Sequence, residues 1–292
     1  MVGINRFLAG IVKEKHPEAA LRLYRKATRE AKEKVDVDLL LDMAVLCDEL
    51  GRTAEAEEYY RKVLEANPRE PRGYYGIAVL YDNLKQYEKA IEYYKKALDL
   101  APGYKKACYF LANAYDETGQ KEEAIQYYRK VVEMDPQDFW AHNNLGAIYE
   151  ETGHDFEAMQ MFKRSLEIDP KHYKALFNMG VIMNKMGYKD KARQYYEASI
   201  GRNPEYPYSF LNLSVMFREE ERYEEAVTVI SRGIEQNPET SFLYYNRACF
   251  YTSIGRLEEG VRDIRRALEL SPGLLEDAQK DEELAPLREF IR

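Results

Sequence analysis

The sequence predicts an all-α solenoid built from tandem pairs of antiparallel helices, and three observations predict it. First, a proline recurs every thirty-four residues along most of the chain. These prolines are Pro68, Pro102, Pro136, Pro170, Pro204, Pro238 and Pro272. Second, each interval between them holds two apolar patterns with helical spacing, separated by a turn. Third, small residues recur at fixed places in both patterns. A fixed period of this length is the signature of a repeat array.

The stretch 105–138 shows one repeat most clearly. Ala112 marks its first predicted helix, Ala124 and Tyr128 mark the second, and Gly119 lies in the turn between them. Glycine suits such a turn because it adopts positive φ without a steric penalty. Glycine recurs at this turn in five of the seven repeats, and Lys85 replaces it in one of the others.

The small and large residues of the frame predict how the helices pack. The small position of the first helix holds Ala44, Ala78, Ala112, Gly146, Gly180, Ser214 and Ala248. The small position of the second helix holds Ala56, Ala90, Ala124, Ala158, Ala192, Ala226 and Gly260. One turn later come the large residues Tyr60, Tyr94, Tyr128, Phe162, Tyr196, Ile230 and Ile264. A small residue allows two helices to approach, and the large residue fills the adjacent space.

The frame divides the chain into three parts. We expect seven tandem repeats over 37–274, a degenerate N-terminal capping repeat over 1–36 and a C-terminal capping helix over 275–292. In the N-terminal part, counting back places Ile4, Phe7, Leu8 and Ile11 on the packing face of a first helix. In the C-terminal part, Leu284, Leu287 and Ile291 keep a helical spacing and are expected to cover the last repeat.

Composition excludes several classes of function. The net charge of −8 argues against a nucleic-acid-binding surface. Three scattered cysteines indicate reduced thiols in a cytoplasmic protein. No catalytic motif, phosphate-binding loop or metal-ligand spacing is present, so the sequence predicts no enzyme, no cofactor and no metal site. Residues 1–36 carry a charge of about +4, which leaves −12 for the rest. A basic amphipathic helix can bind anionic membranes, but the match to the packing frame favours a cap.

The period, the small positions and the closing prolines resemble the tetratricopeptide repeat (TPR). The resemblance covers 37–274 and implies a right-handed superhelix whose first helices line a concave groove. It also implies a non-enzymatic scaffold or adaptor that binds an extended peptide or a helix of a partner protein in that groove. The alternative is a regulatory or assembly subunit that contacts partners, or itself, through the convex surface or the capping helices.

Four consecutive repeats place asparagine at the same position of the first helix. These residues are Asn144, Asn178, Asn212 and Asn246, and Asn113 adds an amide in an earlier repeat. The pattern resembles the asparagine ladder of O-linked N-acetylglucosamine transferases, whose side-chain amides hold a peptide backbone, although their catalytic region has no counterpart here. An amide both donates and accepts hydrogen bonds, so it suits any extended chain. The alternative is that these amides bond within the scaffold.

Aromatic and acidic residues accompany the asparagines. The aromatic side chains expected to face the groove are Tyr109, Trp140, Phe177, Tyr208 and Tyr245. They are candidate interface anchors, and the alternative is packing between adjacent first helices. The acidic residues at the ends of the first helices are Asp48, Glu49, Asp82, Asp116, Glu117, Glu150 and Glu151. Acids there oppose the helix dipole by about 0.3–1 kcal/mol each, so we expect them to serve a basic segment of a partner.

Overall fold

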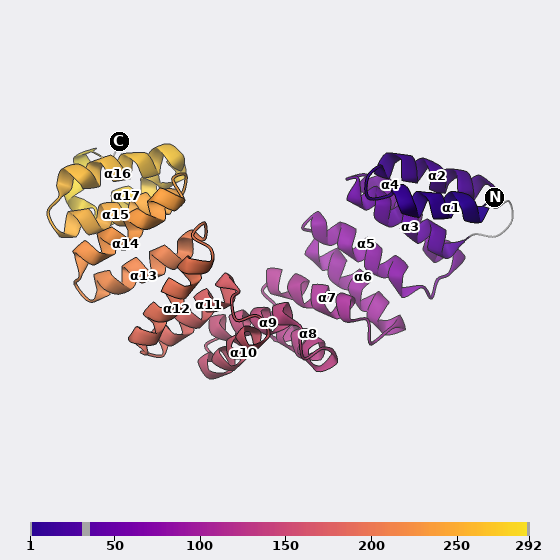
Figure 1. Ribbon diagram of the computed structural model, residues 1–292, viewed down its shortest axis with the longest axis horizontal. Coiled ribbons are helices and arrows are strands. Elements are labelled where there is room, and N and C mark those ends of the chain that lie inside the picture. Colours follow the sequence, from indigo (N-terminus) through magenta and orange to yellow (C-terminus); the bar gives the residue numbers. More distant parts are fainter. Residues whose placement is uncertain (1, 31–35, 291–292) are drawn as a thin grey trace. The chain divides into compact units, whose positions relative to one another are not determined.

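Figure 1 shows the computed structural model, which describes residues 2–30 and 36–290. These residues form α-helices and two short 3₁₀ helices, and they contain no β-strand. The all-α prediction is therefore confirmed. The chain divides into two compact units, the first ending at Ile148 and the second beginning at Tyr149. The boundary falls inside one helix.

The first unit consists of helices that stack in consecutive antiparallel pairs (Figure 1). They are α1 (Val2–Val12), α2 (Pro17–Glu30), α3 (Val37–Glu49), α4 (Thr53–Ala66), α5 (Pro71–Asn83), α6 (Tyr87–Leu100), α7 (Lys105–Glu117), α8 (Lys121–Met134) and the first part of α9 (Phe139–Glu151). Each pair also contacts the next, as α4 contacts α5 and α6 contacts α7. Every repeat is therefore covered mainly by its immediate neighbours, as in other solenoids.

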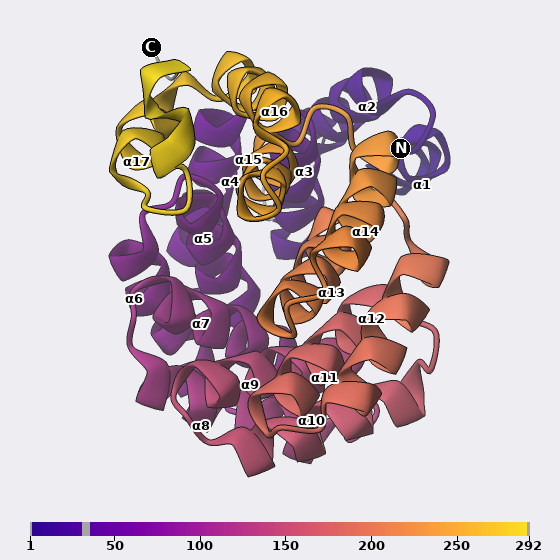
Figure 2. The same ribbon diagram turned by 90° about the vertical axis from the view of Figure 1, so that its left-hand side faces the viewer.

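The second unit continues the same pattern. Its helices are α10 (Asp155–Ile168), α11 (Tyr173–Lys185), α12 (Lys189–Arg202), α13 (Pro207–Glu219), α14 (Tyr223–Gln236), α15 (Ser241–Ser253), α16 (Leu257–Leu270) and α17 (Leu275–Lys280). The 3₁₀ helices η1 (Pro272–Leu274) and η2 (Ala285–Phe290) flank α17. Figure 2 shows α17 at the C-terminal end of this stack, near α15 and α16.

The small and large positions of the frame form the core. All seven large residues of the second helices are 5% exposed or less, from Tyr60 to Ile264. Gly180 shows how closely the helices approach at a small position, because a Cβ atom added there would lie 2.7 Å from the Tyr196 ring. Gly76, two residues before the small position Ala78, is also crowded, since an added Cβ would lie 2.2 Å from the Tyr60 ring. Both distances are below van der Waals contact, so a larger residue at either place requires the ring or the helix to move.

The turns between paired helices have a left-handed residue in common. The five predicted glycines have φ between +70° and +82°. Lys85 and Glu221 take the same place in the other two repeats, with φ of 56° and 60°. The conformation is thus kept even where the residue that adopts it most easily is absent.

The packing predicted for α1 was wrong. Ile4, Phe7, Leu8 and Ile11 are 64%, 69%, 41% and 62% exposed, whereas Ala9 is fully buried. These residues nevertheless occupy packing positions, because with Ala9 in the small position Ile4, Leu8 and Ile11 correspond to Leu39, Met43 and Leu46 of α3, which are at most 1% exposed. The face of α3 is covered by the helix before it, as the contact between Met43 and Thr28 of α2 shows. No described helix precedes α1 to cover the same face.

The C-terminal residues form a cover over α16. Ala278, Leu284 and Leu287 are fully buried, and η2 contacts α16. Polar contacts support this cover, because the Tyr245 hydroxyl donates to Asp281 over 2.7 Å and Arg218 pairs with Glu283 at 2.7 Å. The α-helix itself ends at Lys280, earlier than predicted. Ile291, which was expected to contribute, lies outside the described residues.

Candidate functional site

Five of the residues predicted for binding in the first unit line one pocket, whereas Tyr109, Trp140, Asp48 and Glu49 are not among its lining residues. This groove pocket has a volume of about 480 Å³ and is formed by the ends of α5 and α7, the start of α6, and side chains of α8 and α9. Its lining residues are Asp82, Asn83, Tyr87, Phe110, Asn113, Asp116, Glu117, Tyr128, Asn144 and Ala147. The lining thus combines three carboxylates, three side-chain amides and three aromatic rings.

The amides of the groove pocket bond to tyrosine hydroxyl groups. The Asn144 amide donates to the hydroxyls of Tyr109 and Tyr128, each over 3.1 Å. The Tyr128 hydroxyl in turn donates to the carbonyl oxygen of Asn113. Tyr128 is 1% exposed, and burial raises the pKa of its hydroxyl. Both amide hydrogens of Asn144 therefore serve the scaffold. Its carbonyl oxygen accepts a long bond from the Asn143 amide over 3.5 Å and keeps one lone pair for a further donor.

The same bond recurs in the second unit where a tyrosine permits it. The Asn212 amide donates to the Tyr196 hydroxyl over 3.4 Å, and Tyr196 precedes Asn212 by sixteen residues, as Tyr128 precedes Asn144. Ile230 stands sixteen residues before Asn246 and offers no hydroxyl. Asn246 instead donates to the backbone carbonyl of its own helix, one turn earlier, over 2.8 Å. The asparagines thus share a position but not a partner.

The predicted acidic residues are partly neutralised. Asp116 pairs with Lys121 at 2.6 Å, and Glu150 pairs with Lys185 at 3.1 Å. Glu49 pairs with Lys13 at 3.3 Å. Because these cations come from other segments of the chain, their contribution was not visible in the acidic pattern of the first helices.

Two carboxylates of the groove pocket form no ion pair with another described residue. Asp82 accepts a hydrogen bond from the Tyr94 hydroxyl over 2.9 Å. Burial raises the pKa of Asp82, while this hydrogen bond lowers it and the nearby charge of Glu117 raises it. Asp48 shows the same tendency one repeat earlier, because burial and then Glu49 raise its pKa. A cation placed near Asp82 and Glu117 would stabilise the charged form of the Asp82 carboxylate, which burial and the neighbouring charge of Glu117 disfavour.

The predicted aromatic anchors have different surroundings. Trp140 and Tyr208 are each 47% exposed and so present large apolar surfaces. Phe177 is half-buried and packs on Tyr206, with ring centroids 5.2 Å apart. Tyr245 is committed to the C-terminal cover through its bond to Asp281, so it holds the scaffold.

Tyr109 is half-buried against its own repeat. Its ring meets Phe110 and Tyr128 edge to face, with centroids 5.4 and 5.7 Å away. Sequence reasoning treated Tyr128 and its equivalents only as core residues. Their hydroxyls were the missed signal, because a buried tyrosine hydroxyl needs a hydrogen-bond partner. Asparagines supply it for Tyr128 and Tyr196, and Asp82 supplies it for Tyr94.

Among the described residues, no group of three or more His, Cys, Asp or Glu side chains is arranged to hold a metal ion. The cysteines Cys47, Cys108 and Cys249 are free and buried. Burial raises the pKa of the Cys47 thiol to about 11, which keeps it protonated and unreactive near neutral pH. None of the described helices has the length and apolar character that a membrane crossing requires.

Comparison with models of protein families identifies the family of this chain. Four family models match, and each describes the tetratricopeptide repeat. Together they match residues 12–160, 173–206 and 243–274. The chain belongs to the tetratricopeptide repeat family. Comparison with curated proteins found no match. The family models do not bear on the likeness to the transferase ladder, which remains an interpretation of the asparagine pattern.

Solved structures place the TPR chain among known solenoids. It is 26% identical to YrrB, described as a TPR protein with an unusual peptide-binding site, with a TM-score of 0.56 over 64% of this chain and 95% of YrrB. It is 26% identical to a MamA protein from Desulfovibrio magneticus RS-1, with a TM-score of 0.52 over 58% of this chain and 95% of that one. A TPR protein from Parabacteroides merdae shares 17% identity and a TM-score of 0.66, over 87% of this chain and 98% of that one. The fold is that of TPR-type protein-interaction scaffolds.

Proposed function

We propose that this TPR chain is a non-enzymatic scaffold that binds an extended, basic segment of a partner protein along its concave groove. The observation that carries the proposal is the groove pocket, where Asp82 and Glu117 lack a cationic partner among the described residues. A lysine or arginine side chain of the partner fits this charge, and Phe110 offers an aromatic face beside it. YrrB, to which the chain is similar, is described as having a peptide-binding site.

The other predicted groove residues take separate roles in this proposal. Trp140 and Tyr208 supply the apolar anchors because they are the exposed members of the aromatic set. The carbonyl oxygen of Asn144 accepts from the partner's backbone, since its two amide hydrogens are already bonded. In this proposal, Asn144 acts only as a hydrogen-bond acceptor for the peptide, whereas the sequence suggested that its side chain would both donate and accept.

The test removes the charge of the groove pocket without changing its shape. A random peptide library displayed on phage is selected against the full chain, and the best binder is synthesised for binding kinetics. We expect it to be rich in lysine and arginine. The double variant Asp82→Asn with Glu117→Gln should slow its association, because the complementary charge steers the encounter. The matched control is Glu122→Gln with Glu133→Gln, which removes two exposed charges from α8.

Two results would contradict the proposal. One is a set of selected peptides with no excess of basic residues. The other is equal weakening by the pocket variant and by the α8 control, since net charge alone would then explain the effect. An alternative function, contact through the helices at the ends of the array, has separate support in the exposed apolar residues of α1.

A further inference from the structure

The groove pocket departs from the asparagine pattern at Phe110. Asparagine is the sixth residue of α9, α11, α13 and α15, whereas the sixth residue of α7 is Phe110. The buried tyrosines beside these positions differ in the same way. Tyr128 bonds to two side-chain amides, but Tyr94, its counterpart one repeat earlier, donates to the carboxylate of Asp82. This part of the pocket therefore offers an aromatic ring and a charged acceptor where the next repeat offers amides.

The ring of Phe110 is held in place by the tyrosine that bonds to Asp82. Phe110 stacks on Tyr94 with ring centroids 6.4 Å apart and an angle of 16° between the ring planes. Phe110 is half-buried and lines the pocket, so part of the ring remains accessible there. Tyr94 thus fixes both the ring and the carboxylate of this part of the pocket.

Two carboxylates lie close enough here to affect each other. Burial raises the pKa of Asp82, the bond from Tyr94 opposes this rise, and the charge of Glu117 adds to it. Burial and then the charges of Glu117 and Asp82 raise the pKa of the Tyr87 hydroxyl, which also lines the pocket. The third carboxylate of the pocket, Asp116, pairs with a lysine of α8 at 2.6 Å. The charge left without a cation among the described residues is therefore that of Asp82 and Glu117.

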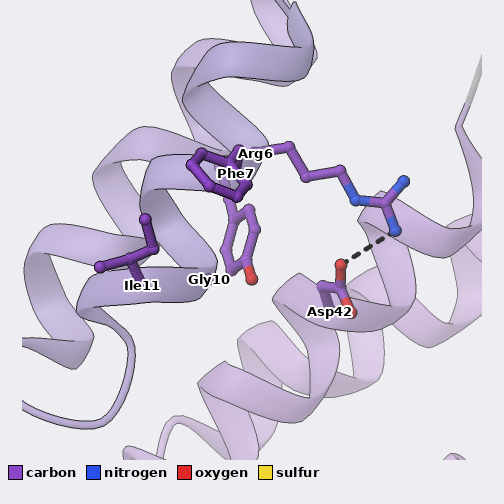
Figure 3. Close-up of a pocket in the computed structure, with 6 residues that line it drawn as sticks. Arg6, Phe7, Gly10, Ile11 and Asp42 are labelled. Atoms are coloured by element: carbon purple, nitrogen blue, oxygen red, sulfur yellow. Dashed lines mark hydrogen bonds and ion pairs between the residues drawn. The ribbon is translucent and has the colours of Figure 1, made fainter.

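Another pocket of the same chain shows how an arginine joins two carboxylates. In Figure 3, Arg6 extends to Asp42, which is the sixth residue of α3, and pairs with it at 3.1 Å. A second guanidinium nitrogen of Arg6 pairs with Asp36 at the same distance. The rings of Phe7 and Tyr24 line this pocket, whose volume is about 490 Å³. The groove pocket, at about 480 Å³, has carboxylates and aromatic rings in a similar space but no arginine among its lining residues.

We propose that the acidic half of the groove pocket, formed by Asp82, Glu117 and Phe110, binds the guanidinium of an arginine in the partner peptide in preference to the ammonium of a lysine. The inference rests on the proposed function, because it names the residue that the basic segment places at this site. A guanidinium is flat, so it can stack on the Phe110 ring while separate N–H groups bond to Asp82 and Glu117. It is also more weakly hydrated than an ammonium, which suits a partly buried carboxylate such as Asp82.

Peptide selection provides the first test. The displayed library contains arginine and lysine at equal frequency, and we expect the peptides selected by the full chain to share an arginine. Replacing that arginine by lysine keeps the charge and should weaken binding by about tenfold or more, as measured by isothermal titration calorimetry. Replacing it by citrulline keeps the flat shape but removes the charge, and should weaken binding at least as much.

Variants of the chain test which groups cause the preference. Phe110→Leu keeps an apolar side chain but removes the flat face, so the lysine and arginine peptides should bind within about threefold of each other. Phe156→Leu is the matched control, because Phe156 is exposed on α10, does not line the pocket and should leave the preference unchanged. Asp82→Asn with Glu117→Gln should weaken the arginine peptide and abolish the preference. Circular dichroism confirms that the variants keep their helices.

A second measurement does not depend on the selection. Carboxyl-carbon NMR of the full chain is recorded during titration with N-acetylarginine amide and, separately, with N-acetyllysine amide. The signals of Asp82 and Glu117, assigned from their single amide variants, should respond at lower concentrations of the arginine probe. Equal responses to the two probes would overturn the inference.

The outcomes distinguish this inference from the proposed function. If lysine and arginine peptides bind equally well and the carboxylate variant weakens both, the arginine site is refuted and the basic partner segment stands. If the selected peptides have no excess of basic residues, both are refuted. An arginine preference that persists in the carboxylate variant would also overturn the inference, because the arginine would then bind elsewhere on the chain.

Discussion

Replacing Asn144 by alanine separates the scaffold role of the asparagines from a role in ligand binding. The variant loses the two hydrogen bonds that the amide donates to Tyr109 and Tyr128. Each neutral bond contributes about 0.5–1.5 kcal/mol net, so the two together contribute about 1–3 kcal/mol. Tyr128 keeps its bond to Asn113, and half-buried Tyr109 reaches water. The cost should therefore fall in the lower half of that range, about 1–2 kcal/mol.

The chain contains a built-in probe for this measurement. Trp140 is the only tryptophan and lies on α9, one turn before Asn144. Urea unfolding followed by its fluorescence should report the local loss, since repeat stability is largely local. The control is Asn246→Ala. In the described contacts, the Asn246 amide bonds only a backbone carbonyl of its own helix. The loss of stability should stay within about 0.5 kcal/mol because alanine favours the helix. An unchanged urea midpoint for Asn144→Ala would refute the scaffold role of this amide. Its two hydrogens would then be available to bind a ligand.

Three further outcomes are expected. Asp263→Ala should lower the free energy of unfolding in urea by about 3–5 kcal/mol, because it leaves the buried guanidinium of Arg247 without its counter-ion. In the native protein this guanidinium bonds both oxygens of the buried Asp263 carboxylate. Changing both residues to apolar ones should restore most of the lost stability. Gly76→Ala should lower the melting temperature by overpacking, whereas Gly201→Ala, with open space around it, should raise it slightly. Because the pKa of Asp82 is raised, its carboxylate should protonate at higher pH than an ordinary aspartate as pH falls, and NMR titration of the carboxyl carbon should show this. A midpoint at or below the usual value near 3.8 would contradict that prediction.

The fold was predictable because its determinants are local and repeated. Each small residue and the large residue one turn later constrain the same helix pair, and seven copies of the pattern confirm one another. The exposure of α1 was not predictable in this way. The frame identifies the positions that pack, such as Ile4 and Leu8, but it does not show whether another helix lies against them.

For the candidate site, the frame gives positions and not contacts. Asn113, Asn144, Asp82 and Glu117 line one pocket, whereas Tyr109 and Trp140 are not among its lining residues, and binding at this pocket stays a prediction. The frame did not show how the amides bond, because that depends on hydroxyl groups that enter from the second helices. The cations were missed for a similar reason. Lys185 reaches Glu150 from thirty-five residues away, since stacking brings residues about one repeat apart into contact.

The left-handed turns at Lys85 and Glu221 have a mechanical consequence. An L-residue with a side chain carries about 1–2 kcal/mol of strain in this conformation, which glycine avoids. One such turn lies in each of the two units, and the packed helices on both sides hold it in place. When the array is pulled from its ends, unfolding of a strained turn releases its backbone strain, so this turn opens at a lower force than a glycine turn. We therefore expect each unit to yield first at its own non-glycine turn, so that the chain extends in two steps whose force thresholds rise when these residues are replaced by glycine.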